Sequence, residues 1–138
     1  MPQQAVMVLR VLLAAVLGAI IGAQREWSGK PAGLRTLSLI ALGSALFAVI
    51  SDATFQLDSR IAAGVVTGIG FLGAGAILHR HGGIEGLTTA AAIWASAGVG
   101  VAAGTGLYLL AVIVTVIVVG LLFVPHLPPP RGQNRPTP

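Results

Sequence analysis

The residues able to do chemistry in this chain are few, and they lie mostly in connections between long apolar stretches. The 138 residues hold four acids, eight Lys or Arg, three histidines and no cysteine. Disulfides, thiolate metal sites and cysteine nucleophiles are therefore excluded. Serine, histidine and acid do not stand at a spacing that suits a catalytic triad, and no pair of acids lies inside an apolar stretch. We therefore expect a protein that is not an enzyme and holds no cofactor.

The densest polar segment, residues 24–36, reads QREWSGKPAGLRT and predicts a turn between two membrane spans. Arg35 and Thr36 stand directly before an apolar run, where an unpaired charge would be expensive. We expect the Arg35 guanidinium to find a carboxylate, with Glu26 as the first choice. A bidentate contact of this kind would make Arg35→Lys nearly as harmful to function as Arg35→Ala. Arg25 is a further functional candidate in the same segment.

Carboxylates and hydroxyls at the ends of spans are also what a cation pathway would use. The alternative is a solvated loop in which two acids and Arg60 pair among themselves. Thr88 and Thr89 have a simpler role open to them as well, since hydroxyls at the start of a helix can satisfy first-turn amides. The pathway candidates are Asp52, Asp58, Thr67, Glu85, Thr88 and Thr89.

The histidines do not define a metal site. His79 and His81 would lie on opposite sides of a helix or on the same side of a strand, and His126 is far along the chain. The His-Arg-His-Gly-Gly run is more typical of a solvated turn. Whether a metal binds directly stays open.

Composition indicates an integral membrane protein. Apolar residues make up 55% of the chain and charged residues 9%, against about a quarter charged in soluble domains. The mean hydropathy is +0.91. The alternating segments of about ten residues that a barrel needs are missing, so we expect an all-α bundle. The net charge of +4 is spread over loops and ends, which argues against a nucleic-acid partner.

We expect about five transmembrane helices in one compact domain, residues 1–125. The first apolar run, which contains Arg10, also has the shape of a signal peptide, but the further apolar runs favour a retained span. The stretch from Gly86 to Val124 is uncharged and too long for one crossing, so it must turn at residues 104–106. Residues 126–138 are proline-rich and predict a disordered tail. The expected spans are residues 5–24, 37–51, 64–78, 87–103 and 107–124.

Glycine marks the third span as the predicted packing centre. Gly64, Gly68 and Gly75 share one helix face at the small-xxx-small spacing, while Gly70 and Gly73 open a second face. The same residues match a dinucleotide fingerprint by chance, because no strand precedes them and no acid follows at the required distance. The Ala- and Gly-rich fourth span should pack on the third inside the bundle. We expect Trp94, in the middle of that span, to be a packing aromatic.

The basic residues predict orientation. In a five-span arrangement, the connections before the second and fourth spans and the C-terminal tail share one side, and they hold most of the Lys and Arg. The positive-inside rule then places the N-terminus outside and the C-terminus in the cytoplasm.

Five ordered blocks resemble the membrane domain of the MgtC/SapB family. They are residues 22–36 (GAQREWSGKPAGLRT), 41–47 (ALGSALF), 60–63 (RIAA), 68–75 (GIGFLGAG) and 86–91 (GLTTAA) with Trp94. The MgtC proteins themselves continue into a cytoplasmic ligand-binding-like domain, which these 138 residues do not include.

The resemblance implies a multi-pass bacterial inner-membrane protein linked to magnesium homeostasis and to virulence, through survival at low magnesium or inside host cells. It further implies a regulator, with restraint of the F-type ATP synthase as one known role in the family. Two functions are open for this chain. One is a regulatory module whose glycine faces bind a second copy, a dimer in the first instance, or another membrane protein; the other is a component of a small cation or solute transporter.

Overall fold

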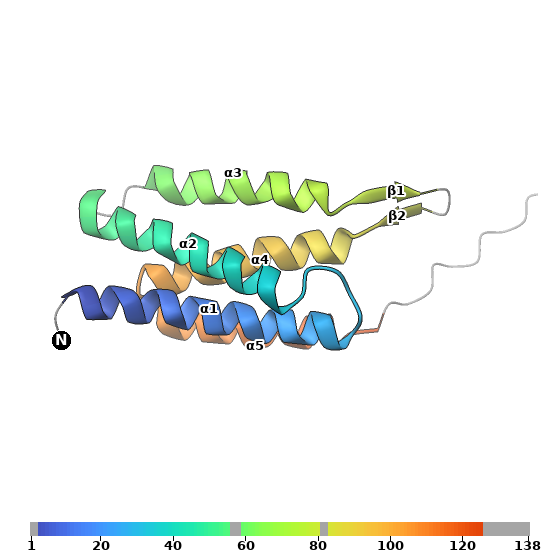
Figure 1. Cartoon of the computed structure of the whole chain (residues 1–138), viewed down its shortest axis with the longest axis horizontal. Helices are drawn as coiled ribbons and strands as arrows, with labels where there is room; N and C mark the ends of the chain where they lie inside the picture. The colour runs from blue at the N-terminus through green and yellow to red at the C-terminus, as the bar shows by residue number, and fades with distance from the viewer. Residues whose placement is uncertain (1–2, 56–58, 81–82, 126–138) are drawn as a thin grey trace, which may run out of the picture.

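The computed structural model describes residues 3–55, 59–80 and 83–125, which form five helices and a two-stranded ribbon (Figure 1). Five helices were predicted, and this is confirmed. The ribbon was not predicted, since its segment was expected to be a plain connection. Asp58, His81 and the 126–138 tail lie outside the described residues. The helices are α1 (Gln3–Trp27), α2 (Leu34–Phe55), α3 (Ser59–Gly75), α4 (Leu87–Gly104) and α5 (Tyr108–Leu122), and the antiparallel strands are β1 (Leu78–Arg80) and β2 (Gly83–Glu85).

The turn between α4 and α5 falls where the sequence predicted it. α4 ends at Gly104, and α5 begins at Tyr108. Gly106 adopts φ of 87°, a left-handed conformation that glycine takes without steric cost. A β-carbon at this position would also lie 3.2 Å from the Arg10 guanidinium. Gly106 therefore allows the backbone to turn and leaves room for the Arg10 side chain.

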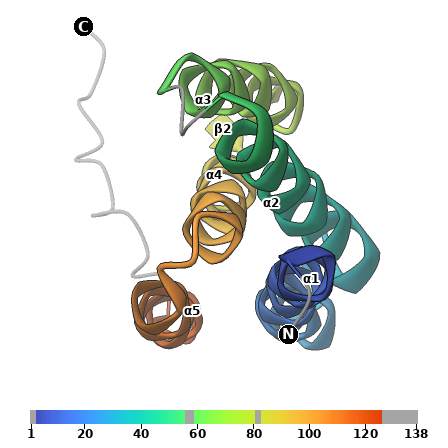
Figure 2. The same cartoon turned by 90° about the vertical axis from the view of Figure 1, so that its left-hand side faces the viewer.

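The helices run side by side along the length of the molecule, and consecutive helices run in opposite directions (Figure 1). Viewed end-on, α2 and α4 lie in the middle, α1 and α5 form one side, and α3 stands at the opposite edge (Figure 2). The buried core lies between α1, α2, α4 and α5. Its members are small or branched apolar residues, among them Ala14, Leu17, Ile21, Leu37, Ala41, Ala45, Ala92, Ile93, Val99, Ala103 and Ala111.

Two glycines bring α1 against the backbone of α2. A β-carbon on Gly18 would lie 2.5 Å from the carbonyl oxygen of Leu37, and one on Gly22 would lie 2.6 Å from the Cα of Leu34. These glycines are four residues apart, so they share one face of α1. Nothing larger than glycine fits at either position unless the two helices move apart.

Two further glycines bring α4 against α2 in the same way. A β-carbon on Gly100 would lie 2.3 Å from the carbonyl oxygen of Ala41, and one on Gly104 would lie 2.6 Å from that of Ala45. Ala41 and Ala45 are also four residues apart, so α2 presents small residues between its two neighbours. We call the contacts of Gly18, Gly22, Gly100 and Gly104 with α2 the seam.

The prediction that the third span is the packing centre is wrong within the chain. In the described residues, a β-carbon on Gly64, Gly68, Gly70 or Gly75 would meet no atom within 4 Å. Gly73 alone of the predicted set faces a neighbour, with Ala90 at 3.7 Å. α3 lies at the edge of the bundle, and most of its glycines point away from α4. We call Gly64, Gly68 and Gly75, which share one side of α3, the open face.

Trp94 also differs from its prediction. Its side chain is 57% exposed on the outside of α4, so it is not part of the core. The buried positions of α4 are instead small ones such as Ser96, Ala97 and Gly100. Close helix contact requires small residues, so a tryptophan in this helix can only point outward.

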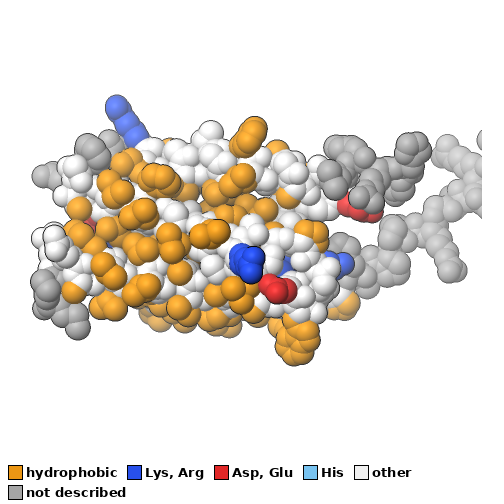
Figure 3. Space-filling view, in the orientation of Figure 1, with side chains coloured by type: hydrophobic (Ala, Val, Ile, Leu, Met, Phe, Trp, Pro, Cys, Tyr) orange, Lys and Arg blue, Asp and Glu red, His pale blue; other side chains and the backbone are white. Residues whose placement is uncertain are grey.

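Three helices are long and apolar enough to cross a membrane: α1, α2 over Leu34–Thr54, and α4. α3 and α5 are shorter apolar helices. Hydrophobic side chains cover the visible face along most of its length (Figure 3). On α5, Leu109, Val116 and Leu121 are each at least 66% exposed, as expected of residues that contact lipid.

Candidate functional site

Three consecutive residues at the end of α1 each bind a different helix or its adjoining turn. Gln24 Nε2 donates to the Leu122 carbonyl at the end of α5, at 3.2 Å. Arg25 donates to the Thr89 hydroxyl in the first turn of α4. Glu26 accepts from the backbone amide of Leu34, at the start of α2, at 3.1 Å. Successive helical residues point about 100° apart, which lets one short stretch reach three neighbours. We call these three residues the junction.

Arg25 is the buried member that carries charge. Its side chain is 4% exposed. The Nη2 atom donates to Thr89 and, at 3.3 Å, to the Pro31 carbonyl. The Nε atom is buried and has no hydrogen-bond partner in the part of the chain that the structure describes. The sequence singled out Arg25 as a candidate but placed the critical contact at Arg35.

The two threonines of α4 divide their roles. Both lie in the first turn, as predicted, but the N-cap is Gly86 and no side chain caps it. Thr89 is buried and accepts a hydrogen bond from Arg25, while Thr88 is half-buried. Within the described residues, no first-turn amide donates to the Thr89 hydroxyl, so its predicted capping role is wrong.

The predicted ion pair between Glu26 and Arg35 does not form; in the described residues, the salt bridge found joins Arg10 and Asp52 instead. Glu26 serves an amide at the start of α2, a position where a carboxylate is favourable. Gly33 makes this approach possible, since a β-carbon there would lie 2.9 Å from Glu26 Oε2. Arg35 is exposed and needs no partner to stay hydrated. A polar depression of about 320 Å³ is lined by Glu26, Gly33, Leu34, Arg35 and Thr36.

A second polar cluster lies at the opposite end of the bundle. Arg10 Nη1 donates to Asp52 Oδ2 at 2.7 Å and to the Gly104 carbonyl at 3.2 Å, and Arg10 Nε donates to the Tyr108 hydroxyl at 3.1 Å. The cluster joins α1, α2, the end of α4 and the start of α5. Asp52 was predicted to stand in a solvated loop or at the mouth of a pathway, and the structure places its carboxylate on an arginine of another helix.

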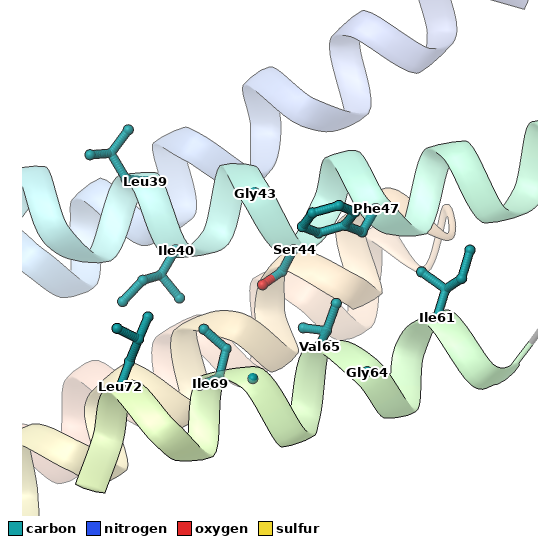
Figure 4. A pocket seen from close by; sticks show the side chains of 11 residues that line it. Leu39, Ile40, Gly43, Ser44, Phe47, Ile61, Gly64, Val65, Ile69 and Leu72 are labelled. Atoms are coloured by element: carbon teal, nitrogen blue, oxygen red, sulfur yellow. The ribbon is translucent and has the colours of Figure 1, made fainter. Parts of the chain in front are cut away.

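An apolar groove of about 620 Å³ separates α2 from α3 (Figure 4). Gly43, Ser44 and Phe47 of α2 line one wall. Gly64 and Gly68 of the open face line the other, so the groove and the open face are continuous. The remaining lining residues are Leu39, Ile40, Ile61, Val65, Ile69 and Leu72.

The other predicted site residues lie apart from these clusters. Arg60 is exposed near the start of α3, and Glu85 is exposed at the end of β2. Thr67 is exposed and donates to the Ala63 carbonyl in its own helix, at 3.0 Å. Among the residues that the structure describes, Arg25 and Thr89 are therefore brought together, but the pathway candidates are not gathered into one path. No group of three or more His, Cys, Asp or Glu side chains in the described ranges is placed to hold a metal ion.

The sequence prediction missed the seam and the Arg10 cluster. The seam had a readable signal, because Gly18 and Gly22, like Gly100 and Gly104, stand at the four-residue spacing used to single out α3. The Arg10 cluster had none, since its members are 42 and 98 positions apart along the chain.

These features define a small helical protein with three helices long and apolar enough to cross a membrane. Glycine contacts hold its helices together, and an arginine joins several helices at each end of the bundle. The family model for the MgtC family matches residues 11–127. The chain belongs to this family.

Three relatives illustrate the similarity. Protein MgtC of Salmonella typhimurium strain LT2 is 49% identical over 113 residues, which are 80% of this chain and 48% of that protein. The putative magnesium transporter YhiD of Escherichia coli K12 is 47% identical over 129 residues, 86% of this chain and 60% of that protein. An uncharacterized protein of Haemophilus influenzae is 44% identical, over 85% of this chain and 54% of its own. The chain thus spans about half to three fifths of these relatives, and no solved structure matches it significantly.

Proposed function

We propose that this chain is the membrane module of an MgtC-type protein of magnesium homeostasis, and that it acts by binding another membrane helix rather than by catalysis. Family membership and the name of the Escherichia coli relative, a putative magnesium transporter, support the link to magnesium. The open face of α3 and the groove beside it support the mode of action. The module is a multi-pass protein of the bacterial inner membrane, with α3 and α5 crossing as well as the three longer helices.

The open face carries the proposal. A glycine face brings two helices close enough for backbone contact, which drives association in lipid because lipid supplies no hydrophobic force between helices. On α1 and α4 such faces are filled by α2. On α3 a β-carbon at these glycines meets nothing in the described chain, and Phe71, on the same side of the helix, is 83% exposed. A partner helix would bury this surface.

The partner we propose is a second copy of this chain. Gly64 and Gly68 form a self-complementary pair, since the same two residues of a second α3 can lie against them across a two-fold axis. Phe71 of each copy lies one turn further along and can enter the groove of the other. Restraint of an ATP synthase, implied by the family resemblance, would require the same kind of helix contact with a different protein.

Disulfide trapping in native membranes tests the dimer. The natural sequence has no cysteine, so one introduced cysteine reports one position. Gly68→Cys should form a disulfide-linked dimer under mild oxidation, because its counterpart lies across the axis. Val116→Cys is the matched control, on a lipid-exposed position of α5. Equal yields at the two positions would overturn the dimer through α3.

Transport is the second candidate, and the name of the Escherichia coli relative, a putative magnesium transporter, favours it. The geometry favours it less, since the groove is lined by apolar side chains and Ser44, and the Asp52 carboxylate is held by Arg10. Liposomes loaded with a magnesium-sensitive dye separate the two functions. We expect no magnesium uptake above that of empty liposomes, and uptake abolished by Asp52→Asn would favour transport.

The orientation proposed for the module is an outside N-terminus and a cytoplasmic C-terminus. The junction, Lys30 and Arg35 stand at the end of the bundle where α1 and α5 finish, which is the end rich in basic residues. A membrane-impermeant thiol reagent applied to intact cells should label Gln3→Cys and leave Ser28→Cys unlabelled. The reverse pattern would invert the topology.

A further inference from the structure

Arg25 is a buried cation whose described partners are all neutral. Its two acceptors are a hydroxyl, on Thr89, and the carbonyl of Pro31. Its Nε is buried with no acceptor among the described residues. A guanidinium taken out of water in this way is costly unless an opposite charge or a full set of acceptors compensates it. Glu26, the next residue, directs its carboxylate to Leu34 instead.

The same guanidinium faces the start of α4, an 18-residue helix. The N-cap is Gly86, with φ of 89° and no side-chain cap. A β-carbon there would lie 2.0 Å from the Ala76 carbonyl oxygen, so the residue types that cap helices do not fit. The amides of the first turn are therefore left without a side-chain acceptor from the N-cap, and they carry the positive end of the helix dipole.

Thr89 connects the guanidinium to this turn. A hydroxyl that accepts one hydrogen bond keeps its hydrogen as a donor for another group. The end of α1 supplies partial negative charge near Arg25, but the start of α4 adds positive charge on the opposite side. A cation, a helix N-terminus and a hydroxyl donor thus converge at one place, which is the chemistry that holds oxyanions.

We infer that Arg25, Thr89 and the first turn of α4 bind an oxyanion of the phosphate class, either free phosphate or the headgroup phosphate of a membrane lipid. The site adjoins the exposed Ser28–Pro31 turn, through the bond from Arg25 to the Pro31 carbonyl. The bond from Nη2 to Pro31 is long, at 3.3 Å, and an arriving anion can replace this carbonyl. This inference does not depend on the proposed dimer, whose contact is made by Gly64 and Gly68 of α3.

The test measures binding to the purified full chain in a phosphate-free detergent. One arm titrates inorganic phosphate by calorimetry. The other compares, by native mass spectrometry, phosphatidylglycerol with a galactolipid of matched chains that has no phosphate. Thr89→Val keeps the shape and the arginine but loses the hydroxyl, and Arg25→Lys keeps the charge but loses the planar fork. Lys30→Gln is the control for charge, since Lys30 is exposed on the adjoining turn.

We expect phosphate, or phosphatidylglycerol in preference to the galactolipid, to bind the natural chain. Binding should weaken about tenfold or more in Thr89→Val and Arg25→Lys and stay within about twofold in Lys30→Gln. Phosphate binding identifies the free anion, and binding of phosphatidylglycerol alone identifies the headgroup. If Arg25→Lys does not fold, Thr89→Val decides. The inference is overturned if neither probe binds selectively, or if a folded Thr89→Val binds as tightly as the natural chain.

Discussion

The seam and the open face carry the same glycine spacing and use it differently. At the seam, glycines of α1 and α4 approach the α2 backbone so closely that a β-carbon would overlap carbonyl oxygens. On the open face, a β-carbon would meet nothing in the described residues. The four-residue glycine spacing therefore indicates that another helix can pack closely against this one. The rest of the fold determines whether that helix belongs to the same chain. This difference gives each region its own mutational signature.

The largest effect is expected at the seam. Gly100→Leu would push α4 away from the Ala41 carbonyl, and a clash with backbone cannot be relieved by a rotamer change. We expect a loss of more than about 3 kcal/mol of stability, seen as loss of folded protein in detergent. Gly98→Leu is the matched control on the same helix, where a β-carbon meets no atom within 4 Å in the described residues. Similar melting temperatures of the two variants would contradict the claim that Gly100 is needed for contact with α2.

A smaller loss is expected at the junction. Thr89→Val removes an acceptor from the buried Arg25 guanidinium, which should cost about 1–3 kcal/mol. Thr88→Val, at the half-buried neighbouring position, should cost less than about 0.5 kcal/mol. Thermal unfolding of both variants in the same detergent gives the comparison. An equal loss would show that the hydroxyl of Thr89 does not support Arg25.

The Arg10 cluster should contribute less than the junction. Its ion pair with Asp52 is partly exposed, with side chains 20% and 34% accessible. Asp52→Asn should therefore cost about 1 kcal/mol or less. The double variant with Arg10→Gln should cost less than the sum of the two single changes, because each single change already breaks the pair. Strict additivity in denaturation measurements would argue against the contact.

Arg35 should show the smallest effect. The sequence predicted Glu26 as the first choice of partner for Arg35; a bidentate contact would make Arg35→Lys harmful, and a role in topology alone would leave it fully active. The structure leaves Arg35 exposed and directs the Glu26 carboxylate to the α2 amide. We therefore expect the charge of Arg35 to matter for topology and the planar shape of its guanidinium not to matter. We expect Arg35→Lys to complement growth at low magnesium as fully as the natural chain does. If Arg35→Lys does not complement at matched membrane levels, Arg35 makes a contact that needs its guanidinium.

The helices were predictable because apolar length and glycine turns are local properties. The break at Gly104–Gly106 is one such case: an uncharged stretch longer than a bilayer must turn, and it does so at its glycines. The candidate site was predicted only in part. Arg25 and Thr89 were each predicted as functional candidates. Their hydrogen bond was not predicted, because they are 64 residues apart and no local pattern indicates such a contact. The Glu26 carboxylate accepts from the Leu34 amide rather than pairing with the Arg35 guanidinium. It can do so because Gly33 has no side chain to block its approach.

The most direct test of the account is the oligomeric state of Gly68→Leu in lipid bilayers, measured by single-molecule photobleaching together with its unfolding temperature. The open face makes this variant harmless to the single chain, since the added side chain enters free space at the rim of the groove. We predict a dimer for the natural chain and a monomer with unchanged unfolding temperature for Gly68→Leu. A natural chain that is already monomeric, or a variant that remains as dimeric as the natural chain, would contradict the claim that the open face of α3 binds a second copy.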